Sequence, residues 1–559
     1  MRETKIERWL PGVRAARTYQ RDWLRPDLVA GLVLAAILVP QGMAYAELAG
    51  LPAVNGLYCT IGCLVGYAIF GPSRVLVLGP DSSVSPLIFA AIIPLVAGGD
   101  AKTAVELAGM LALLVGLIEV AMGLGRLGFI ADLLSSEVQV GYMNGLAVTI
   151  IIGQLPKLFG FSTDATSFRG EVAAFFENLD QTKGAALAVG AGVLLVLLVL
   201  PRFTRKVPAV LVAVVGATVL SAILGLSDHI ATVGKLPSGF PKPTLPWTSR
   251  HDVWPLLIAA FGITLVSLTD TIATSTAFAA RRGDEVDPDQ EMVGIGAANL
   301  FAGFLQGFAV STSSSRTAVA EQSGARSQLT GLVGAGLVAV LIVFLNSLLK
   351  DLPQSVLAAV VIAAALSLLD LGALRRYAAV RRSALLLSLT ATIAVIALGV
   401  LEGIAVAIVL AIALFFRRNW WPHGAILGRV GGLDGWHSVE VFDEAREEPG
   451  VVVYRWEAPL FFANAGAFRR QVRHLVRDKH PRWVVIECEA MTDIDVTGAG
   501  VVEQLDRELN QEGINMAFVE MRTRLQDLVE RYGLFETLDR DHFYPSVDRA
   551  LAAIREEQP

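Results

Sequence analysis

Two apolar stretches of the chain begin with clustered glycine, proline and hydroxyl residues. One reads Val77-Leu-Gly-Pro-Asp-Ser-Ser-Val-Ser-Pro86, and the other reads Gly307-Phe-Ala-Val-Ser-Thr-Ser-Ser-Ser-Arg316. A break in a membrane helix frees backbone N–H and C=O groups that have no water partner, so such breaks persist where they line a cavity. Helix N-termini carry unpaired N–H donors and a partial positive charge. Two of them facing each other near mid-membrane predict an anion site, as in a secondary transporter.

Polar side chains around these breaks are the candidate ligands. The hydroxyls offer donors beside the free backbone N–H groups, although the same residues can cap a helix or fill a tight helix crossing. Arg316 lies one turn into the second broken helix, where it either raises the potential for an anion, reaches the surface or pairs with an acid. The predicted substrate-binding residues are Gln41, Tyr45, Ser82, Ser83, Ser313, Ser314 and Arg316.

Two acids are candidates for coupling transport to a second ion. Asp270 lies deep in an apolar run, where a lone carboxyl is neutral or pairs with a proton, a cation or an arginine. Thr274 follows one turn later on the same face, so the two side chains can coordinate Na⁺; otherwise Asp270 carries a proton. Asp81 either caps a helix or, because a carboxylate repels an anion unless it is protonated, couples uptake to H⁺. We therefore predict that Asp270, Thr274 and Asp81 bind the coupling ion, with H⁺ favoured over Na⁺.

The elements that position these residues are long apolar runs. A membrane helix needs about 20 mostly apolar residues. From Gln41 to Ser82 is 41 positions, and from Asp270 to Ser313 is 43, so each half places a polar residue and a broken helix at a similar spacing. The pattern predicts an α-helical polytopic membrane protein with 14 transmembrane segments in 7+7 inverted repeats. The segments are 27–49, 54–70, 80–98, 103–124, 136–155, 184–201, 207–225, 254–279, 289–305, 311–323, 328–348, 354–371, 383–400 and 402–416.

Charge divides the chain into an apolar body and an acidic tail. Of the 559 residues, 54% are hydrophobic and 18% are charged, and residues 431–559 hold 25 acidic and 15 basic side chains. Arginines recur in alternate short loops, so the positive-inside rule places both termini in the cytoplasm of a multi-pass protein of the inner (plasma) membrane. The expected parts are a cytoplasmic segment 1–26 that is not a signal peptide, a transport domain 27–416, a linker with a leading strand 417–449, and a tail domain 450–559.

The tail alternates strands and amphipathic helices. Val451–Trp456 and Trp483–Glu487 are β-like runs, and the helical segments are 467–477, 498–510 and 524–532. This alternation predicts one small α/β domain. Between a strand and a helix, Thr497 is a candidate phosphorylation site, although the favoured interpretation is a helix cap.

Other chemistry is not predicted. The three cysteines, Cys59, Cys63 and Cys488, suit packing and complete no metal site. The sequence lacks a Walker motif, a dinucleotide fingerprint, HExxH and a nucleophile elbow, so we expect no enzyme and no cofactor beyond the coupling ion. It also lacks a basic and aromatic pattern for nucleic acid.

Several motifs resemble the sulfate permease (SulP) family of anion transporters, and the tail resembles a STAS domain, the module shared by sulfate transporters and anti-sigma-factor antagonists. The motifs are Asp27-Leu-Val-Ala-Gly-Leu, Val39-Pro-Gln-Gly-Met-Ala-Tyr-Ala46, Ala49-Gly-Leu-Pro-Ala-Val-Asn-Gly-Leu-Tyr58, Gly71-Pro-Ser-Arg with Gly79-Pro80, Phe278-Ala-Ala-Arg-Arg-Gly with Val286-Asp, and Ser314-Ser-Arg-Thr317.

The resemblance implies core and gate subdomains, a cytoplasmic STAS domain, a homodimer, and a site between the third and tenth segments aided by the first and eighth. Gln41 and Tyr45 match polar and aromatic positions of the first segment. Asp270 matches a position that is usually Glu but is Asp in cyanobacterial sodium–bicarbonate members, where it coordinates Na⁺ with a threonine that Thr274 matches, and Ser314 matches a further ligand. Asp81 departs from the family pattern.

The tail departs from its family as well. It has Asp495-Val-Thr-Gly498 where the phosphorylated antagonists have Asp-Ser-Ser-Gly, so Thr497 aligns with their phosphorylation site. The resemblance therefore leaves open whether phosphorylation of this residue regulates the protein, and a regulatory protein is a candidate partner of the STAS domain.

Together these features predict a secondary active transporter that imports a small oxyanion, sulfate first, by proton symport with alternating access. The alternatives are a sodium-coupled bicarbonate symporter, a proton-coupled C4-dicarboxylate transporter and a passive anion channel. An alternative of another class is a membrane-anchored STAS sensor.

Overall fold

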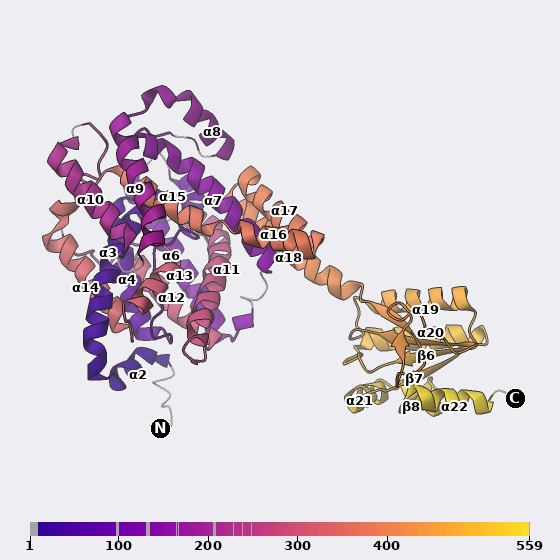
Figure 1. Cartoon of the computed structure of the whole chain (residues 1–559). Helices are drawn as coiled ribbons and strands as arrows, with labels where there is room; N and C mark the ends of the chain where they lie inside the picture. The colour runs from indigo at the N-terminus through magenta and orange to yellow at the C-terminus, as the bar shows by residue number, and fades with distance from the viewer. Residues whose placement is uncertain are drawn as a thin grey trace. The chain divides into compact units, whose positions relative to one another are not determined.

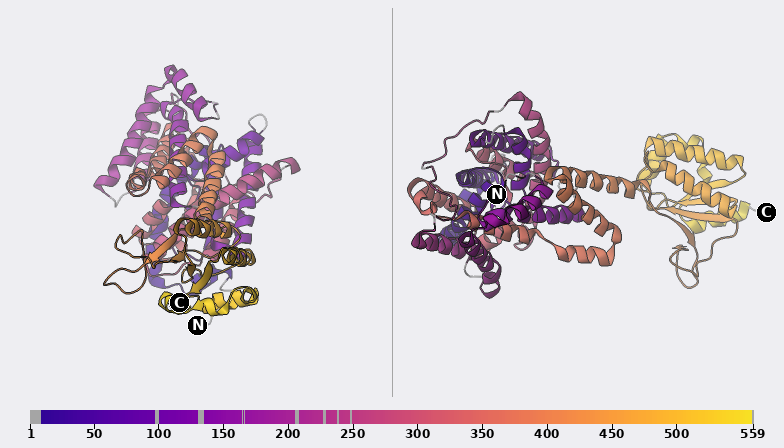
Figure 2. Two further views of the ribbon diagram at one scale, coloured as in Figure 1. Left: turned by 90° about the vertical axis from the view of Figure 1, so that its right-hand side faces the viewer. Right: turned by 90° about the horizontal axis from the view of Figure 1, so that it is seen from above.

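A computed structural model describes residues 9–96, 100–129, 135–163, 165, 167–204, 208–226, 229–237, 239–247 and 249–557. Residues 1–8 of the predicted N-terminal segment lie outside this part. The chain divides into two compact units, 1–411 and 412–559. Figures 1 and 2 show the first as closely packed helices and the second as a sheet flanked by helices.

The helices of the first unit follow the apolar runs. They are α2 (Pro11–Arg17), α3 (Leu24–Leu48), α4 (Ala53–Phe70), α5 (Ser85–Ile92), α6 (Ala101–Leu124), α7 (Ser136–Phe159), α8 (Phe168–Glu177), α9 (Gly184–Phe203), α10 (Ala209–Leu224), α11 (Arg250–Ala280), α12 (Pro288–Phe304), α13 (Ser314–Gln322), α14 (Leu329–Phe344), α15 (Gln354–Leu368), α16 (Leu371–Val380), α17 (Arg382–Leu398) and α18 (Val400–Trp420). The strands are β1 (Leu78–Gly79) and β2 (Ser311–Thr312).

Each of the fourteen predicted segments contains a helix. Seven helical stretches of the described part are long and apolar enough to cross a membrane, and five further apolar helices are shorter. The two interrupted segments hold the short helices α5 and α13, which begin after the Gly, Pro and Ser clusters. The helical membrane architecture is therefore confirmed, whereas the count of fourteen crossings stays a prediction.

Most contacts between the helices form two groups, which meet where α3 packs against α15 and α10. In one group, α12 packs against α6 and α4, α14 packs against α3 and α4, and α11 packs against α6. In the other group, α7 packs against α15 and α17, and α9 packs against α10 and α15. This division places the first four and the eighth to eleventh predicted segments together, as expected of core and gate subdomains.

Small residues let α6 and α12 approach closely. A Cβ added to Gly116 would lie 2.7 Å from the carbonyl oxygen of Gly296, and a Cβ added to Gly296 would lie 2.8 Å from that of Gly116. Such close backbone contact is typical of glycine-bearing faces of membrane helices. It brings the middle of α6 against the helix that leads to β2.

The second unit is an α/β domain. Its sheet order is β4-β3-β5-β6-β7-β8, in which β5 to β8 are parallel and β3 and β4 are antiparallel additions. Alternate residues of β5 face opposite sides: Val452 and Tyr454 pack in the core with α19 and α20, and Val451 and Val453 pack with α22. Figure 1 shows α19 and α22 on opposite sides of the sheet.

The elements of this unit are β3 (Gly424–Gly428), β4 (His437–Ser438), β5 (Val451–Trp456), α19 (Ala465–Lys479), β6 (Trp483–Glu487), α20 (Val496–Gln511), β7 (Asn515–Val519), α21 (Thr523–Arg531), β8 (Phe543–Tyr544) and α22 (Val547–Glu557). Both β3 and β4 lie within 417–449, so part of the segment expected to be a linker belongs to the sheet.

Candidate anion-binding site

The two broken segments meet through a short antiparallel ladder. Leu78 of β1 is paired with Thr312 of β2, and Gly79 is paired with Ser311. Contacts extend beyond the strands, because the Ser313 N–H donates to the Val77 carbonyl at 3.2 Å. Helices α5 and α13 therefore begin within a few residues of one shared point, as the spacing of the two segments predicts.

Arg316 joins the two segments. Its side chain is 1% exposed, and its guanidinium donates to the Pro80 carbonyl at 2.5 Å and to the Gly79 carbonyl at 3.4 Å. It also forms an ion pair with Asp81, with Nη2 3.5 Å from Oδ1. A buried charge needs such partners. Of the three alternatives that the sequence left open for Arg316, a position at the surface is wrong, because the side chain is buried; the residue pairs with an acid and lies beside the first broken segment.

In the segment before α5, the Ser83 and Ser85 hydroxyls form hydrogen bonds within the segment itself. The Asp81 carboxylate accepts from the Ser83 N–H at 3.0 Å and from the Ser83 hydroxyl at 2.9 Å, and the Ser85 hydroxyl donates to the Asp81 carbonyl at 2.8 Å. The N-cap of α5 is Val84, which makes no side-chain cap. The interpretation of Asp81 as a helix N-cap is therefore wrong in detail, since Asp81 closes the turn before the helix.

The segment before α13 leaves donors unused. The Ser311 and Thr312 hydroxyls are buried, and neither has a hydrogen-bond partner within the described residues. The Ser313 hydroxyl caps α13 by accepting from the Arg316 N–H at 3.5 Å, while Ser314 is exposed. An unpaired buried hydroxyl costs free energy unless a ligand satisfies it.

The remaining predicted residues lie at different depths of the site. Asp270 accepts from the Gln139 amide at 3.4 Å and is close enough to Asp81 to interact with it electrostatically. Tyr45 is buried and lies within electrostatic reach of Ser82, which is also buried, Asp81 and Arg316. This arrangement joins four of the predicted segments, namely the first, third, eighth and tenth.

Two predicted residues are not brought into the hydrogen-bonded centre. Thr274 is buried one turn beyond Asp270, and Gln41 is half-buried one turn before Tyr45. Within the described chain, neither side chain hydrogen-bonds to the other predicted site residues.

Residues of α7 complete the site, and the sequence analysis missed them. The Tyr142 hydroxyl donates to the Ser83 carbonyl at 2.9 Å, and Gln139 contacts Asp270 as described above. Their spacing of three places them on one face of a predicted membrane segment, which was the available signal. Both come from the second group of helices, so the site lies where the two groups meet.

Free space beside Asp270 is small in this conformation. A pocket of about 10 Å³ is lined by residues of α7, α11 and α18, including Gln139, Tyr142, Asp270 and Ile404. That volume suits about one water molecule. This space is too small for an oxyanion in the present conformation.

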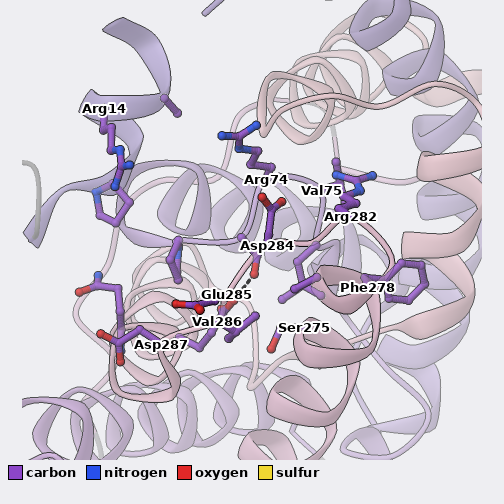
Figure 3. A pocket seen from close by; sticks show the side chains of 18 of the residues that line it. Arg14, Arg74, Val75, Ser275, Phe278, Arg282, Asp284, Glu285, Val286 and Asp287 are labelled. Atoms are coloured by element: carbon purple, nitrogen blue, oxygen red, sulfur yellow. Dashed lines mark hydrogen bonds between the residues drawn. The ribbon is translucent and has the colours of Figure 1, made fainter. Parts of the chain in front are cut away.

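A larger cavity of about 350 Å³ lies farther along α11. Asp270, Thr274 and Phe278 recur every four residues along one face of α11, and Phe278 lines this cavity together with Arg282, which lies in the turn after the helix. Figure 3 shows three arginines along one side of it and Glu285 and Asp287 on the other. The arginines are Arg14, Arg74 and Arg282.

In the second unit, Thr497 is exposed at the second position of α20, and the N-cap is Asp495, whose carboxylate accepts from the Gly498 N–H at 2.7 Å. The favoured interpretation of Thr497 as the cap is therefore wrong, and its hydroxyl is accessible.

One acidic group in this unit has the spacing of a metal site. Carboxylate oxygens of Glu487, Glu489 and Glu520 lie within 4.8 Å of one another. Arg455 forms an ion pair with Glu487, which favours a structural role.

Comparison with known proteins gives consistent matches along the whole chain. A family model described as "Sulfate permease family" matches residues 24–391, and one described as "STAS domain" matches residues 444–550. A probable sulfate transporter of Mycobacterium tuberculosis is 42% identical over 551 residues, covering 98% of each chain. Solute carrier family 26 member 6 of Homo sapiens is 34% identical, covering 82% of this chain and 63% of its own.

Solved structures give the same fold. The murine Solute Carrier 26 family member A9 anion transporter, in the inward-facing state, superposes with a TM-score of 0.91 at 24% identity, covering 100% of this chain and 96% of its own. The transmembrane domain of the cyanobacterium bicarbonate transporter BicA superposes with a TM-score of 0.62 at 24% identity, covering 70% of this chain and 98% of its own.

Proposed function

The chain belongs to the sulfate permease family, and we propose that it is a secondary active transporter that imports a small oxyanion, sulfate first, by proton symport with alternating access. The family consists of membrane anion transporters, not enzymes. The curated relative that is 42% identical is named a probable sulfate transporter, which favours sulfate as the substrate.

The observation that carries the proposal is the donor set of the second broken segment. The Ser311 and Thr312 hydroxyls are buried and have no hydrogen-bond partner among the described residues, and Arg316, whose guanidinium is held by the first segment, follows them in α13. Because neighbouring residues of a strand point to opposite faces, an oxyanion at this place accepts from one of the two hydroxyls and gains charge-assisted hydrogen bonds from Arg316. The exposed Ser314 and the N-terminal end of α13 add donors at the same place.

Proton coupling follows from the acids around this donor set. An ionised Asp81 forms an ion pair with the Arg316 guanidinium, and Asp270 lies within electrostatic reach of Asp81. Protonation of Asp81 would remove its charge, weaken the ion pair and free Arg316 for the anion. A proton would then enter with each anion bound, and Asp270 would hold a second proton or share the first.

Alternating access is supported by the lack of space beside Asp270. The site is built from both groups of helices, since Tyr142 and Gln139 belong to one group and Ser83 and Asp270 belong to the other. Separation of the groups would open the site. The larger cavity farther along α11, with Arg74 and Arg282 at its side, is a suitable path between the site and the side of α2.

Uptake by the purified full-length chain in proteoliposomes tests this proposal. We expect radiolabelled sulfate to accumulate when the outside is acidic and not when only a Na⁺ gradient is present. Sulfate that equilibrates without accumulation under either gradient, together with anion currents, would overturn symport in favour of a passive channel.

Sodium coupling is the second candidate, and a specific observation favours it. Asp270 and Thr274 lie one turn apart on one face of α11, and a carboxylate with a hydroxyl suits Na⁺. The same liposomes decide between the two: accumulation driven by Na⁺ at equal pH, with bicarbonate as the preferred anion in competition, would replace proton-driven sulfate uptake. Proton-driven uptake in which a C4-dicarboxylate is the preferred competitor would keep the coupling and change the substrate.

We further propose a homodimer in the inner (plasma) membrane with both termini cytoplasmic, a regulatory role for the STAS unit, and a protein partner for it. Removal of residues 440–559 separates this role from a sensor function. Retained uptake would make the tail regulatory, whereas a full-length chain that moves no anion would favour a STAS sensor. Cross-linking in native membranes tests the dimer, and labelling of cysteines introduced near each terminus tests the topology.

A further inference from the structure

A buried polar cluster forms hydrogen bonds with the backbone immediately before β2. The Val310 N–H donates to Asn299 Oδ1 at 2.7 Å, and the Val310 carbonyl accepts from the Ser267 hydroxyl at 3.2 Å. Asn299 Nδ2 in turn donates to Glu119 Oε2 at 2.7 Å. Glu119, Asn299 and Ser267 are each 0% exposed. They belong to α6, α12 and α11, so three helices hold one residue of the chain that leads to Ser311.

The hydrogen bonds of this cluster bear on whether the Glu119 carboxyl is protonated. Glu119 Oε1 accepts no hydrogen bond within the described chain, although Ser267 lies next to this carboxyl. Ser267 has one hydroxyl proton and donates it to Val310. While Ser267 donates to Val310, only a protonated Oε1 could bond to Ser267, as the donor. A buried carboxylate without a cation beside it would also carry a large desolvation penalty, which favours the neutral acid.

We propose that Glu119 is a positioning residue of the anion site, which acts as a neutral carboxylic acid to fix β2 against α11. The acid accepts from Asn299, and its proton would let it donate to Ser267 and so close a ring around Val310. The ring sets where Ser311 and Thr312 present their hydroxyls. It also joins β2 to the helix that carries Asp270, three residues beyond Ser267 in the sequence.

Other titratable groups do not take this role. The helices packed against the middle of α6 bring Asp270, which is bonded to Gln139, and Glu291, which is bonded to Tyr67 and Ser73. Helix α5 carries no titratable residue. Loss of the Glu119 proton would thus leave Ser267 without its donor and place an uncompensated charge beside Asn299.

Hydrogen–deuterium exchange of the full-length protein in nanodiscs, without substrate, tests directly whether Glu119 holds residues 307–313 in place. Glu119→Leu removes the hydrogen bond with Asn299 and the proposed one with Ser267, so amide exchange across residues 307–313 should rise roughly tenfold. Glu119→Gln can donate to Ser267 and accept from Asn299, so exchange there should stay within about twofold of the wild type. Glu106→Gln is the matched control on α6, because Glu106 makes only an exposed ion pair with Lys102.

A pH series keeps the test decisive if Glu119→Leu does not fold. After correction for the intrinsic exchange rate, alkaline pH should deprotonate Glu119 and release residues 307–313 in the wild type but not in Glu119→Gln. Exchange that is equally fast in Glu119→Gln and Glu119→Leu, or a pH series in which the two chains behave alike, would overturn the proposal. The consequence for uptake rests on the proposed function, whereas these exchange results do not, so the two can fail separately.

Discussion

The two broken segments, residues 77–92 and 310–322, stand at corresponding places in the two halves of the chain and differ in their hydrogen bonding. In the first, Asp81 and Ser83 satisfy each other, and Ser85 bonds to the backbone. In the second, the Ser311 and Thr312 hydroxyls have no partner within the described residues. The Ser83 and Ser85 hydroxyls of the first segment thus have hydrogen-bond acceptors, whereas the Ser311 and Thr312 hydroxyls of the second have none among the described residues.

The two segments therefore share a backbone arrangement but differ in the hydrogen bonds that their side chains make. The antiparallel pairing of β1 with β2 needs the same short extended stretch in both halves. The first segment supplies acceptors, namely two carbonyls and Asp81, that hold Arg316. The second supplies donors for an oxyanion. Substitutions in the two segments should therefore have different effects.

The largest effect is expected from the residue that joins the segments. Arg316→Gln should abolish sulfate uptake and should destabilise the protein by roughly 3–5 kcal/mol, because Asp81 is left as an unpaired buried charge. Uptake in proteoliposomes and thermal unfolding in detergent measure the two effects.

The double variant Asp81→Asn with Arg316→Gln separates charge from function. It should recover most of the lost stability, since no unpaired charge remains, but it should recover no uptake. Recovery of uptake in the double variant would show that Arg316 serves only to neutralise Asp81.

The second effect concerns coupling and not binding. Asp270→Asn should lower proton-driven sulfate accumulation by roughly a hundredfold, because a carboxamide carries no proton at this position. Sulfate exchange across liposomes at equal pH should persist. Accumulation at the wild-type level would remove Asp270 from the mechanism.

The sequence could predict the segments but not their bonding. Apolar length and the Gly, Pro and Ser clusters placed α5 and α13 because helix breaks have a local cause in the chain. It did not predict the hydrogen bonds between Asp81 and Ser83, since a carboxylate at the start of an expected helix is equally consistent with an N-cap. Tyr142, Gln139 and Glu119 were missed because their roles depend on contacts with residues 59, 131 and 180 positions away.

The third effect distinguishes donors from scaffold. Ser311→Ala should raise the KM for sulfate roughly tenfold through loss of a hydrogen bond to a charged ligand, with little change in stability, because the hydroxyl has no partner to lose. Ser83→Ala should do the reverse: it should lower the thermal midpoint, since a hydroxyl bonded to Asp81 is removed, and should change the KM less. Equal effects of the two variants on the KM would erase the distinction between the segments.

The smallest effect is expected at the cap of α13. Ser313 accepts from the Arg316 N–H at 3.5 Å, a long bond, so Ser313→Ala should cost about 0.5–1 kcal/mol, the low end for an N-cap. Ser313→Asn retains a capping acceptor and should restore the stability. The KM should follow stability only weakly if Ser313 serves mainly as the cap, because Ser311 and Thr312 remain as donors. A Ser313→Asn variant that is as stable as the wild type but binds sulfate tenfold more weakly would instead make Ser313 a direct ligand, and the donor set would then extend from β2 into the first residues around α13.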